Sequence, residues 1–310
     1  MSKAPRISVG TVRAAATAVA GDVGRWSVAG WVHEVGREAE VPVFRKVVAE
    51  SLAGGASAVT LYAWSGRTPC RVCRWCSAGL IDHCERPLKR ERPGPGHLGT
   101  DSGCTERVPT VEAEVVPLGA LRIERAAWVG VVARAMRIAQ FASASESTFI
   151  TLLGSDACTL VAAQVLAIAA PRVRVLAEDD GALERCDRWG IRHRALGAAG
   201  LRGDQDVVIV GGCVAPDVLA MAAAHCRPRG RIVLTESFAG AGASVHSTVA
   251  GVVARELVVA GVRGGSLRDA AAAMMGGRGP DTEGLGFEVF TGPGEGSLIG
   301  ASRFGRVVRV

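Results

Sequence analysis

Residues 148–180 read TFITLLGSDACTLVAAQVLAIAAPRVRVLAEDD, and the order of patterns in this stretch decides the fold. A short β-rich run, TFITLL, ends at Gly154, and the helical run CTLVAAQVLAIAA follows it. A second β-rich run, RVRVLA, ends at Ala177. These patterns predict a βαβ unit, because parallel strands need a crossover connection that a helix usually supplies.

The same alternation continues toward the C-terminus. The run GALERCDRWGI predicts a helix closed by Gly190, and QDVVIVGG predicts a third strand. The helical run PDVLAMAAAHC is stopped by RPRG, and RIVLTE predicts a fourth strand. Strands that alternate with helices in this way predict an α/β fold with a doubly wound parallel sheet. The forty glycines and the Ala/Val-rich runs suit strands that are covered on both faces.

The bulk composition limits the classes of function. The 310 residues carry a net charge of +6, but no basic block is interleaved with aromatic residues, so a mildly basic surface is favoured over a nucleic-acid interface. The N-terminal MSKAPRISVG has no signal-peptide core, and no run of about eighteen apolar residues predicts a membrane helix. The odd number of cysteines, nine, favours a reducing cytoplasm with thiols used for metal binding or packing.

Four of the nine cysteines lie in TPCRVCRWCSAGLIDHC, residues 68–84, at Cys70, Cys73, Cys76 and Cys84. Two C-x2-C spacings let tight turns aim the sulfurs at one point, and Gly79 could supply the turn before the last cysteine. Four thiolates around Zn2+ make a closed site, which is structural rather than catalytic. Packing cysteines, an iron–sulfur cluster and a zinc ribbon are the alternatives. Ferredoxin-type runs have three residues before the last cysteine and ribbons use two separated pairs, so both fit the spacing less well.

The cysteine spacing resembles the structural zinc lobe of the medium-chain dehydrogenase/reductase family, the zinc-containing alcohol dehydrogenases. The chain follows the order of that family from near residue 25 onward. SVAGWVHEVGREAE resembles the strand F-A-G-x-V-x-E-V-G, and HLGTDSGCTERV resembles L-G-x-x-x-x-G-x-x-A-E-Y-V. Near the C-terminus, RELVVAGVRGG resembles K-E-L-T-x-x-G-S, and GRVVRV resembles the closing strand G-K-V-V-L.

This resemblance implies a domain plan. We expect a truncated GroES-like β-rich domain at 1–127, with the cysteine lobe at 68–88. A Rossmann-type nucleotide-binding domain is expected at 128–265, and a C-terminal segment at 266–310 returns to the first domain. The chain is short for the family, so we expect it to lack the first strand or two of the GroES-like domain.

Family enzymes also hold a second, open zinc site, and the resemblance implies that its ligands are lost here. Those ligands are an early cysteine, the histidine of a G-H-E motif and a later cysteine or glutamate. No cysteine precedes Cys70, and the alignment places G-H-E on Arg25, Trp26 and Ser27. The third ligand would fall near Gly130. The catalytic residues therefore stay unknown.

A rival alignment would make His33 and Glu34 the H-E pair. It shortens the spacing to RKVV by seven residues and is therefore disfavoured. His33 is then an ordinary strand histidine, and Cys104 and Cys158 are expected to be packing residues.

The first helix of the nucleotide-binding domain should begin with the fingerprint G-x-G-x-x-G. Residues 154–159 read GSDACT, so only Gly154 of the three glycines is present. Asp156 would repel the phosphates of a cofactor unless it turns away, and it competes for the field of the helix N-terminus. Thr159 adds bulk where the helix should pack closely. Gly154, Ser155 and Asp156 are candidate cofactor-binding residues.

The acidic residue that binds the ribose should end the second strand. The alignment puts Ala177 there, with Glu178 next and Asp179 and Asp180 beyond. Glu178 could bind the ribose hydroxyls if the loop shifts by one residue, and the acidic run would disfavour the 2'-phosphate of NADP. A solvated acidic loop is the open alternative.

Two functions remain open at this point. The first is an alcohol dehydrogenase-like protein with one structural Zn2+ per chain, at most a divergent NAD(H)-linked oxidoreductase without catalytic zinc. The alternative is a catalytically inactive homologue that acts as a structural or regulatory partner of an active paralogue. Either is expected to be cytoplasmic, without a membrane partner, as a homo-oligomer or a hetero-oligomer with a related dehydrogenase. Nucleic-acid binding is disfavoured; it would rest on basic residues in and near the lobe, Arg71, Arg74, Lys89, Arg90 and Arg92.

Overall fold

The computed structural model divides the chain into two units. The first comprises residues 1–130, 267–278 and 286–310, and the second comprises residues 131–266 and 279–285. The residues described are 17–20, 27–31, 61–65, 69–86, 115–119, 121, 123–126, 128–198, 200, 202–212, 217–235, 245–282, 285, 288–291 and 306–309.

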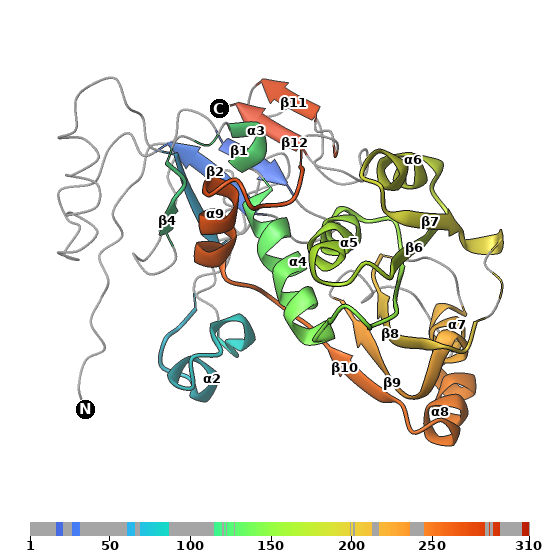
Figure 1. Cartoon of the computed structure of the whole chain (residues 1–310). Coiled ribbons are helices and arrows are strands. Elements are labelled where there is room, and N and C mark those ends of the chain that lie inside the picture. The colour runs from blue at the N-terminus through green and yellow to red at the C-terminus, as the bar shows by residue number, and fades with distance from the viewer. Residues whose placement is uncertain are drawn as a thin grey trace. The chain divides into compact units, whose positions relative to one another are not determined.

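The second unit is built on a six-stranded parallel sheet. The strands lie in the order β10-β9-β8-β5-β6-β7, and every neighbouring pair is parallel (Figure 1). The first half of the unit runs outward from β5 in one direction and the second half runs outward from β8 in the other. This is the strand order of a Rossmann-type doubly wound fold. The strands are β5 (Ile150–Leu153), β6 (Val173–Ala177), β7 (Arg192–Ala195), β8 (Gln205–Val210), β9 (Cys226–Leu234) and β10 (Val258–Gly261).

Helices follow most of these strands and cover the sheet. α5 packs on β5 and β6, α6 on β6 and β7, and α7 on β8 and β9, while α7 and α8 lie side by side (Figure 1). The central strands are short and buried, as the apolar run ITLL requires. One core cluster joins Leu153, Leu176 and Val210 of the strands to Val218 and Ala222 of α7. The helices are α4 (Val129–Ala142), α5 (Ala157–Ala169), α6 (Asp180–Arg188), α7 (Val218–His225) and α8 (Val245–Ala254).

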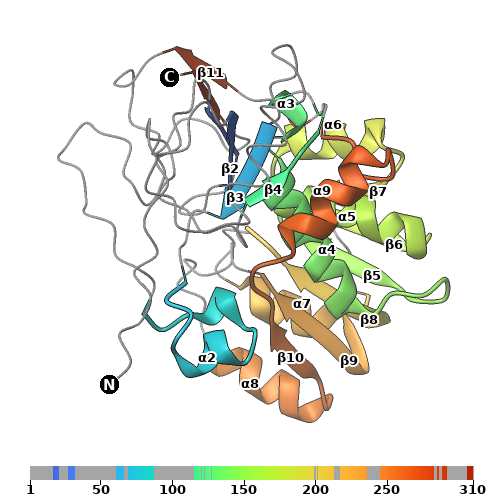
Figure 2. The ribbon, with the colours of Figure 1, turned by 90° about the vertical axis from the view of Figure 1, so that its left-hand side faces the viewer.

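The first unit holds a second, mostly antiparallel sheet, in the order β11-β12-β1-β2-β3-β4. β12 pairs antiparallel with β1, with Thr17 opposite Val308, so the strand predicted at GRVVRV lies in this sheet. α9 lies beside β3 and β4 (Figure 2). The elements of this unit are β1 (Thr17–Ala20), β2 (Ser27–Trp31), β3 (Leu61–Ser65), α2 (Arg74–Ser77), the 3-10 turn η1 (Ile81–His83), β4 (Val115–Pro117), α3 (Ile123–Ala126), α9 (Leu267–Met275), β11 (Glu288–Thr291) and β12 (Arg306–Arg309). The second unit also contains the 3-10 turn η4 (Leu196–Ala198).

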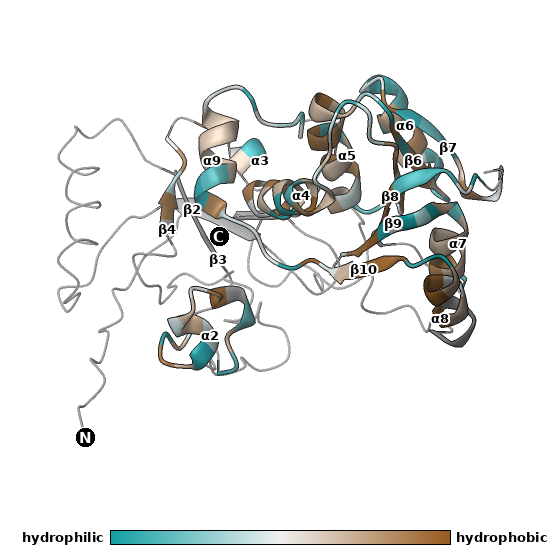
Figure 3. Ribbon diagram, turned by 60° about the horizontal axis from the view of Figure 1, so that its bottom comes forward, coloured by the Kyte–Doolittle hydropathy of each residue, from teal (hydrophilic) through white to brown (hydrophobic). Residues whose placement is uncertain are grey.

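The α/β class and the Rossmann-type sheet predicted from residues 148–180 are confirmed. The strand numbering needs a correction, because β7 precedes QDVVIVGG, which is therefore the fourth strand of this sheet. β7 reads RHRA, is mostly exposed and is coloured hydrophilic in Figure 3. Among the described strands β7 pairs only with β6, so as an edge strand it needs no apolar pattern.

Residues 279–285 belong to the second unit. Contacts of Gln164 on α5 hold them there. Its Nε2 donates to the Asp281 carbonyl at 2.9 Å, and the Asp281 N–H donates back to Gln164 Oε1 at 2.8 Å. Trp189 Nε1 also donates to the Asp281 carboxylate at 3.1 Å. The side chains of Gln164 on α5 and of Trp189 at the C-cap of α6 thus hold the segment.

Among the described residues, no helix combines the length and the apolar character that crossing a membrane requires.

Candidate functional site

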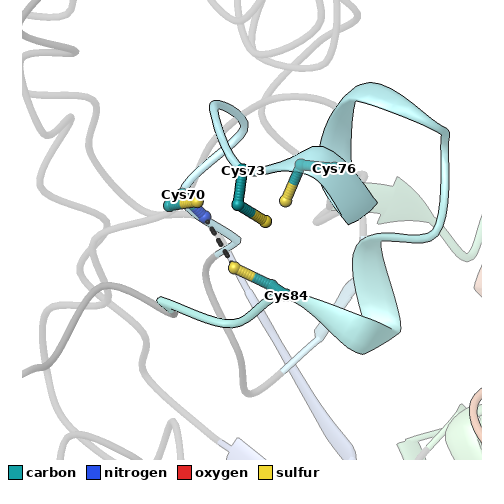
Figure 4. Close-up of side chains that lie close together, drawn as sticks. All are labelled: Cys70, Cys73, Cys76 and Cys84. Atoms are coloured by element: carbon teal, nitrogen blue, oxygen red, sulfur yellow. Dashed lines mark hydrogen bonds between the residues drawn. The ribbon is translucent and has the colours of Figure 1, made fainter.

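Four thiols meet in the cysteine lobe of the first unit. The sulfur atoms of Cys70, Cys73, Cys76 and Cys84 all lie within 4.8 Å of one another. Their side chains point toward a common centre (Figure 4). The lobe lies between β3 and β4 in the chain, and each of the four cysteines is partly buried.

Short turns bring these cysteines together. Cys73 is the N-cap of the single-turn helix α2, and Cys76 lies within that helix. Gly79 then reverses the chain with a φ of 78°, a left-handed conformation that glycine adopts without a steric penalty. Its N–H donates to the Cys76 carbonyl at 3.0 Å. The turn η1 follows and ends at Cys84.

The donor set and its dimensions fit a metal ion that prefers sulfur. Four sulfurs bonded to Zn2+ at about 2.3 Å form a tetrahedron with edges of about 3.8 Å. No sulfur–sulfur separation exceeds that edge by more than about 1 Å, a gap that side-chain rotation can close. The Cys70 N–H donates to Cys84 Sγ at 3.2 Å, a contact that stabilises a thiolate ligand. The cluster could therefore hold one metal ion.

The thiols of the cluster differ in pKa. Backbone N–H groups, that of Cys76 first, stabilise the Cys73 thiolate and lower its pKa to about 6. The backbone N–H of Val72 lowers the pKa of Cys70 in the same way. Burial raises the pKa of Cys76 to about 12. Thiols crowded together cannot all ionise, whereas a bound dication would stabilise every thiolate.

In the second unit, the carboxyl ends of β5 and β8 lie next to each other where the strand order reverses. Open α/β sheets bind their ligands outside this switch point. Gly154 follows β5 with a φ of 141°. A Cβ there would lie 3.2 Å from the Gly212 N and 3.3 Å from the Gly211 carbonyl carbon. The loops that follow β5 and β8 are thus in backbone contact, and this position requires glycine.

Asp156 lies in the loop after β5 and does not turn away from the switch point. It is the N-cap of α5, and its Oδ1 accepts from the Thr159 N–H at 3.0 Å. Its Oδ2 accepts from Thr159 Oγ1 and from the Gly212 N–H, both at 2.5 Å. The carboxylate is therefore held by donors from the first turn of α5 and from the loop after β8. Ser155, the neighbouring candidate residue, is buried.

The bulk of Thr159 is accommodated by a glycine on the facing loop. A Cβ built on Gly211 would lie 1.8 Å from Thr159 Oγ1 and 2.7 Å from Asp156 Oδ2. Gly211 and Gly212 are the functional residues that sequence reasoning missed. The signal was the double glycine that ends QDVVIVGG.

The three acidic residues after β6, Glu178 to Asp180, differ in their contacts and exposure. Asp179 is the N-cap of α6 and accepts from the Ala182 N–H at 3.0 Å. Asp180 begins α6 and is exposed. Ala177 is buried at the end of β6, and Glu178 is exposed just beyond it. Glu178 and Asp180 are thus the exposed acids of this run, and Glu178 is the one that directly follows the strand.

No family model and no curated protein matches the chain. Solved structures do match it. A zinc-binding dehydrogenase from Sinorhizobium meliloti 1021 bound to NADP is 15% identical, with a TM-score of 0.74 over 99% of this chain and 94% of that chain. A short chain alcohol dehydrogenase from E. coli CFT073 complexed with NADH is 17% identical, with a TM-score of 0.69 over 94% and 87%. The alcohol dehydrogenase of Aeropyrum pernix is 16% identical, with a TM-score of 0.66 over 94% and 88%.

The chain has the fold of the zinc-containing alcohol dehydrogenases. Identities of this size show the fold alone, so the site residues of this alcohol dehydrogenase fold must be judged one by one. Ser27 begins β2, and Gly130 is buried in α4. Cys158 is buried on α5. Arg25, Trp26, His33 and Cys104 lie outside the described residues.

Proposed function

We propose that this chain is an alcohol dehydrogenase-like zinc-binding protein, a divergent NAD(H)-linked oxidoreductase that works without a catalytic zinc. One observation carries the proposal. The loops after β5 and β8 meet at the switch point, where Gly154 lies against the backbone of Gly211 and Gly212. This is the place at which doubly wound sheets take dinucleotides. The similar structures bound to NADP and complexed with NADH support the assignment.

NAD(H) would supply the hydride chemistry at this site. The chain itself contributes binding and orientation. Gly154 permits close approach of the backbone, and the N-terminus of α5 favours a negative charge. Glu178, exposed just beyond β6, would accept hydrogen bonds from ribose hydroxyls. Together with Asp179 and Asp180 it disfavours the extra phosphate of NADP, because like charges repel.

Cys70, Cys73, Cys76 and Cys84 would hold one Zn2+. With four protein ligands, no coordination position is left for a substrate, so this ion cross-links the lobe and takes no part in a chemical step. The catalytic zinc of the family enzymes would have to be replaced by other groups, and no residue is assigned to that role.

Calorimetry with NADH and with NADPH, on protein loaded with zinc, tests the proposal. We expect NADH to bind in the micromolar range and NADPH to bind at least tenfold more weakly. A tenfold difference in affinity corresponds to about 1.4 kcal/mol of binding free energy. Metal analysis should find about one zinc per chain. A screen of aldehydes and ketones that follows NADH oxidation would then look for the substrate. No NADH binding at millimolar concentration would overturn the oxidoreductase proposal.

The contacts of Asp156 favour a second candidate, the catalytically inactive homologue that serves as a structural or regulatory partner. A carboxylate already occupies the donors that a cofactor phosphate would need. Two observations together would support this candidate: no NADH binding, and copurification of a second dehydrogenase-fold chain. Turnover by the purified chain alone would exclude it.

The edge strand β10 suggests how the protein assembles. Among the described strands, β10 pairs on one side only, with β9. Val258 and Val259 are 54% and 46% exposed, and Figure 3 shows β10 as hydrophobic. An apolar edge of this kind is a template for pairing with another strand. We propose that β10 pairs with β10 of a second copy of the chain.

A further inference from the structure

We propose that the carboxylate of Asp156 occupies the pyrophosphate position at the switch point and weakens dinucleotide binding. This inference rests on the proposed function, because it concerns the same binding site. It differs from simple charge repulsion between the chain and a cofactor. Asp156 acts as a built-in anion that any dinucleotide must displace.

The first argument is the set of donors that the carboxylate uses. The Thr159 N–H lies in the first turn of α5, where backbone N–H groups have no partner within the helix and attract anions. Asp156 Oδ1 accepts from that N–H at 3.0 Å. The carboxylate therefore already uses part of the anion-binding capacity of the helix.

The second argument is that the carboxylate also reaches the facing loop. The Gly212 N–H, beyond the end of β8, donates to Asp156 Oδ2 at 2.5 Å. Thr159 Oγ1 donates to the same oxygen at 2.5 Å. One side chain thus links the loops after β5 and β8, with three donors around its charge.

The third argument is space. A Cβ on Gly212 would lie 2.9 Å from Asp156 Cβ and 3.0 Å from Asp156 Oδ2. A Cβ on Gly211 would lie 2.7 Å from Asp156 Oδ2. The Asp156 side chain therefore fills the gap between these two glycines and α5. A phosphate cannot share that gap while the carboxylate remains, since both are anions and both need the same N–H groups.

These contacts predict that removing the carboxylate improves the site. Asp156→Gly restores the second glycine of the fingerprint and removes both the charge and the bulk. Asp156→Asn keeps the size of the side chain and its capping ability but removes the charge. NADH should bind at least tenfold more tightly to Asp156→Gly than to the original chain, with Asp156→Asn in between.

Asp206→Asn is the matched control. Asp206 lies at the opposite end of β8 and holds the Phe149 N–H at 2.8 Å, so this variant also removes one carboxylate that accepts from a backbone N–H near β5. It should leave NADH affinity unchanged, because its carboxylate lies at the start of the strand. Thermal unfolding of every variant would show which of them are folded, and Asp156→Asn covers the case in which Asp156→Gly is not.

Titration of the zinc-loaded chains with NADH separates the outcomes. Tighter binding by the Asp156 variants supports the inference, whether or not the original chain binds. If only the variants bind, the inference stands and the proposed NAD(H) function of the original chain falls. If the original chain binds and the folded Asp156 variants bind equally well, the inference is overturned and the proposed function stands. If no folded chain binds NADH, both are overturned.

Discussion

Replacing Gly211 by alanine should destabilise the second unit, and the structure gives the reason for each part of the effect. The added Cβ would lie 1.8 Å from Thr159 Oγ1 and 3.0 Å from Thr159 Cβ. Ordinary contacts between such atoms need about 3.5 Å, so the loop or α5 must shift by about 1.7 Å. Gly211 has no left-handed φ, and therefore the cost comes from space rather than from backbone strain. Overpacking of a buried site costs about 1–3 kcal/mol.

Urea denaturation followed by circular dichroism would measure this loss. We expect Gly211→Ala to lower the free energy of unfolding by about 2–3 kcal/mol, near the upper end of the overpacking range, because the Cβ meets both Thr159 and Asp156. Gly197→Ala is the control, since a Cβ there meets nothing within 4 Å, and surface changes of this kind stay within about 0.5 kcal/mol.

The clash with Thr159 also predicts coupling between the two positions. Thr159→Ala alone removes the hydroxyl that donates to Asp156 and should cost about 1 kcal/mol. In the Gly211→Ala/Thr159→Ala double variant the closest contact is gone, so the total loss should be smaller than the sum of the single losses by about 1 kcal/mol or more. Additive losses, or a Gly211→Ala effect no larger than that of Gly197→Ala, would refute the proposed packing of the two loops.

Three further predictions follow from other parts of the chain. Cys73→Ser should reduce the zinc content after dialysis from about one per chain to nearly none, because a closed site needs all four thiolates. Metal analysis would measure this content. The control Cys186→Ala, at a buried position on α6, should keep the metal. Burial and the nearby Arg174 lower the pKa of His225 below 6.5, so its neutral form stabilises the fold above about pH 6.5 and that contribution is lost as the pH falls toward the lowered value. The free energy of unfolding should therefore be lower at pH about 5.5 than at pH about 8, and this decrease should be smaller in His225→Gln than in the original chain. An identical decrease in both proteins would contradict this account. If β10 forms the proposed dimer interface, Val258→Lys should convert the dimer to a monomer, as measured by light scattering. The control Val72→Lys, at an exposed position in the cysteine lobe, should leave the dimer intact. A Val258→Lys variant that stays dimeric would show that β10 is not the interface.

Local patterns were sufficient to predict the parallel sheet and its buried strands. ITLL is a short apolar run that ends at Gly154, VRVLA is a β-rich run with four apolar residues that follows Pro171, and between them lies a helix without a charged residue. β7 was not predicted because RHRA is a mostly exposed strand without a core-facing apolar run, and within the described part of the chain it pairs with β6 alone. Its pairing with β6 is decided by tertiary structure rather than by propensity.

In the candidate site, too, some features follow from local sequence and others depend on tertiary structure. The spacing of the four cysteines was enough to predict that their sulfurs converge, because two short turns set the geometry locally. The direction of the Asp156 side chain was left open by the sequence. It depends on the Gly212 N–H, which lies 56 positions away in the chain and reaches Asp156 only through the adjacency of β5 and β8. Contacts of that range become visible only when the strand order is known.

The pairing of β1 with β12 bears on the order in which the chain assembles. Every strand of the parallel sheet lies between Ile150 and Gly261, so this sheet can form while the ribosome is still adding the C-terminal residues. The other sheet needs Thr17 opposite Val308, and such distant pairing carries the full entropy of closing the intervening chain. We expect its amide protons to gain protection later in pulsed hydrogen exchange during refolding. A chain that stalls before Arg306 would leave one side of β1 unpaired, a ready partner for aggregation.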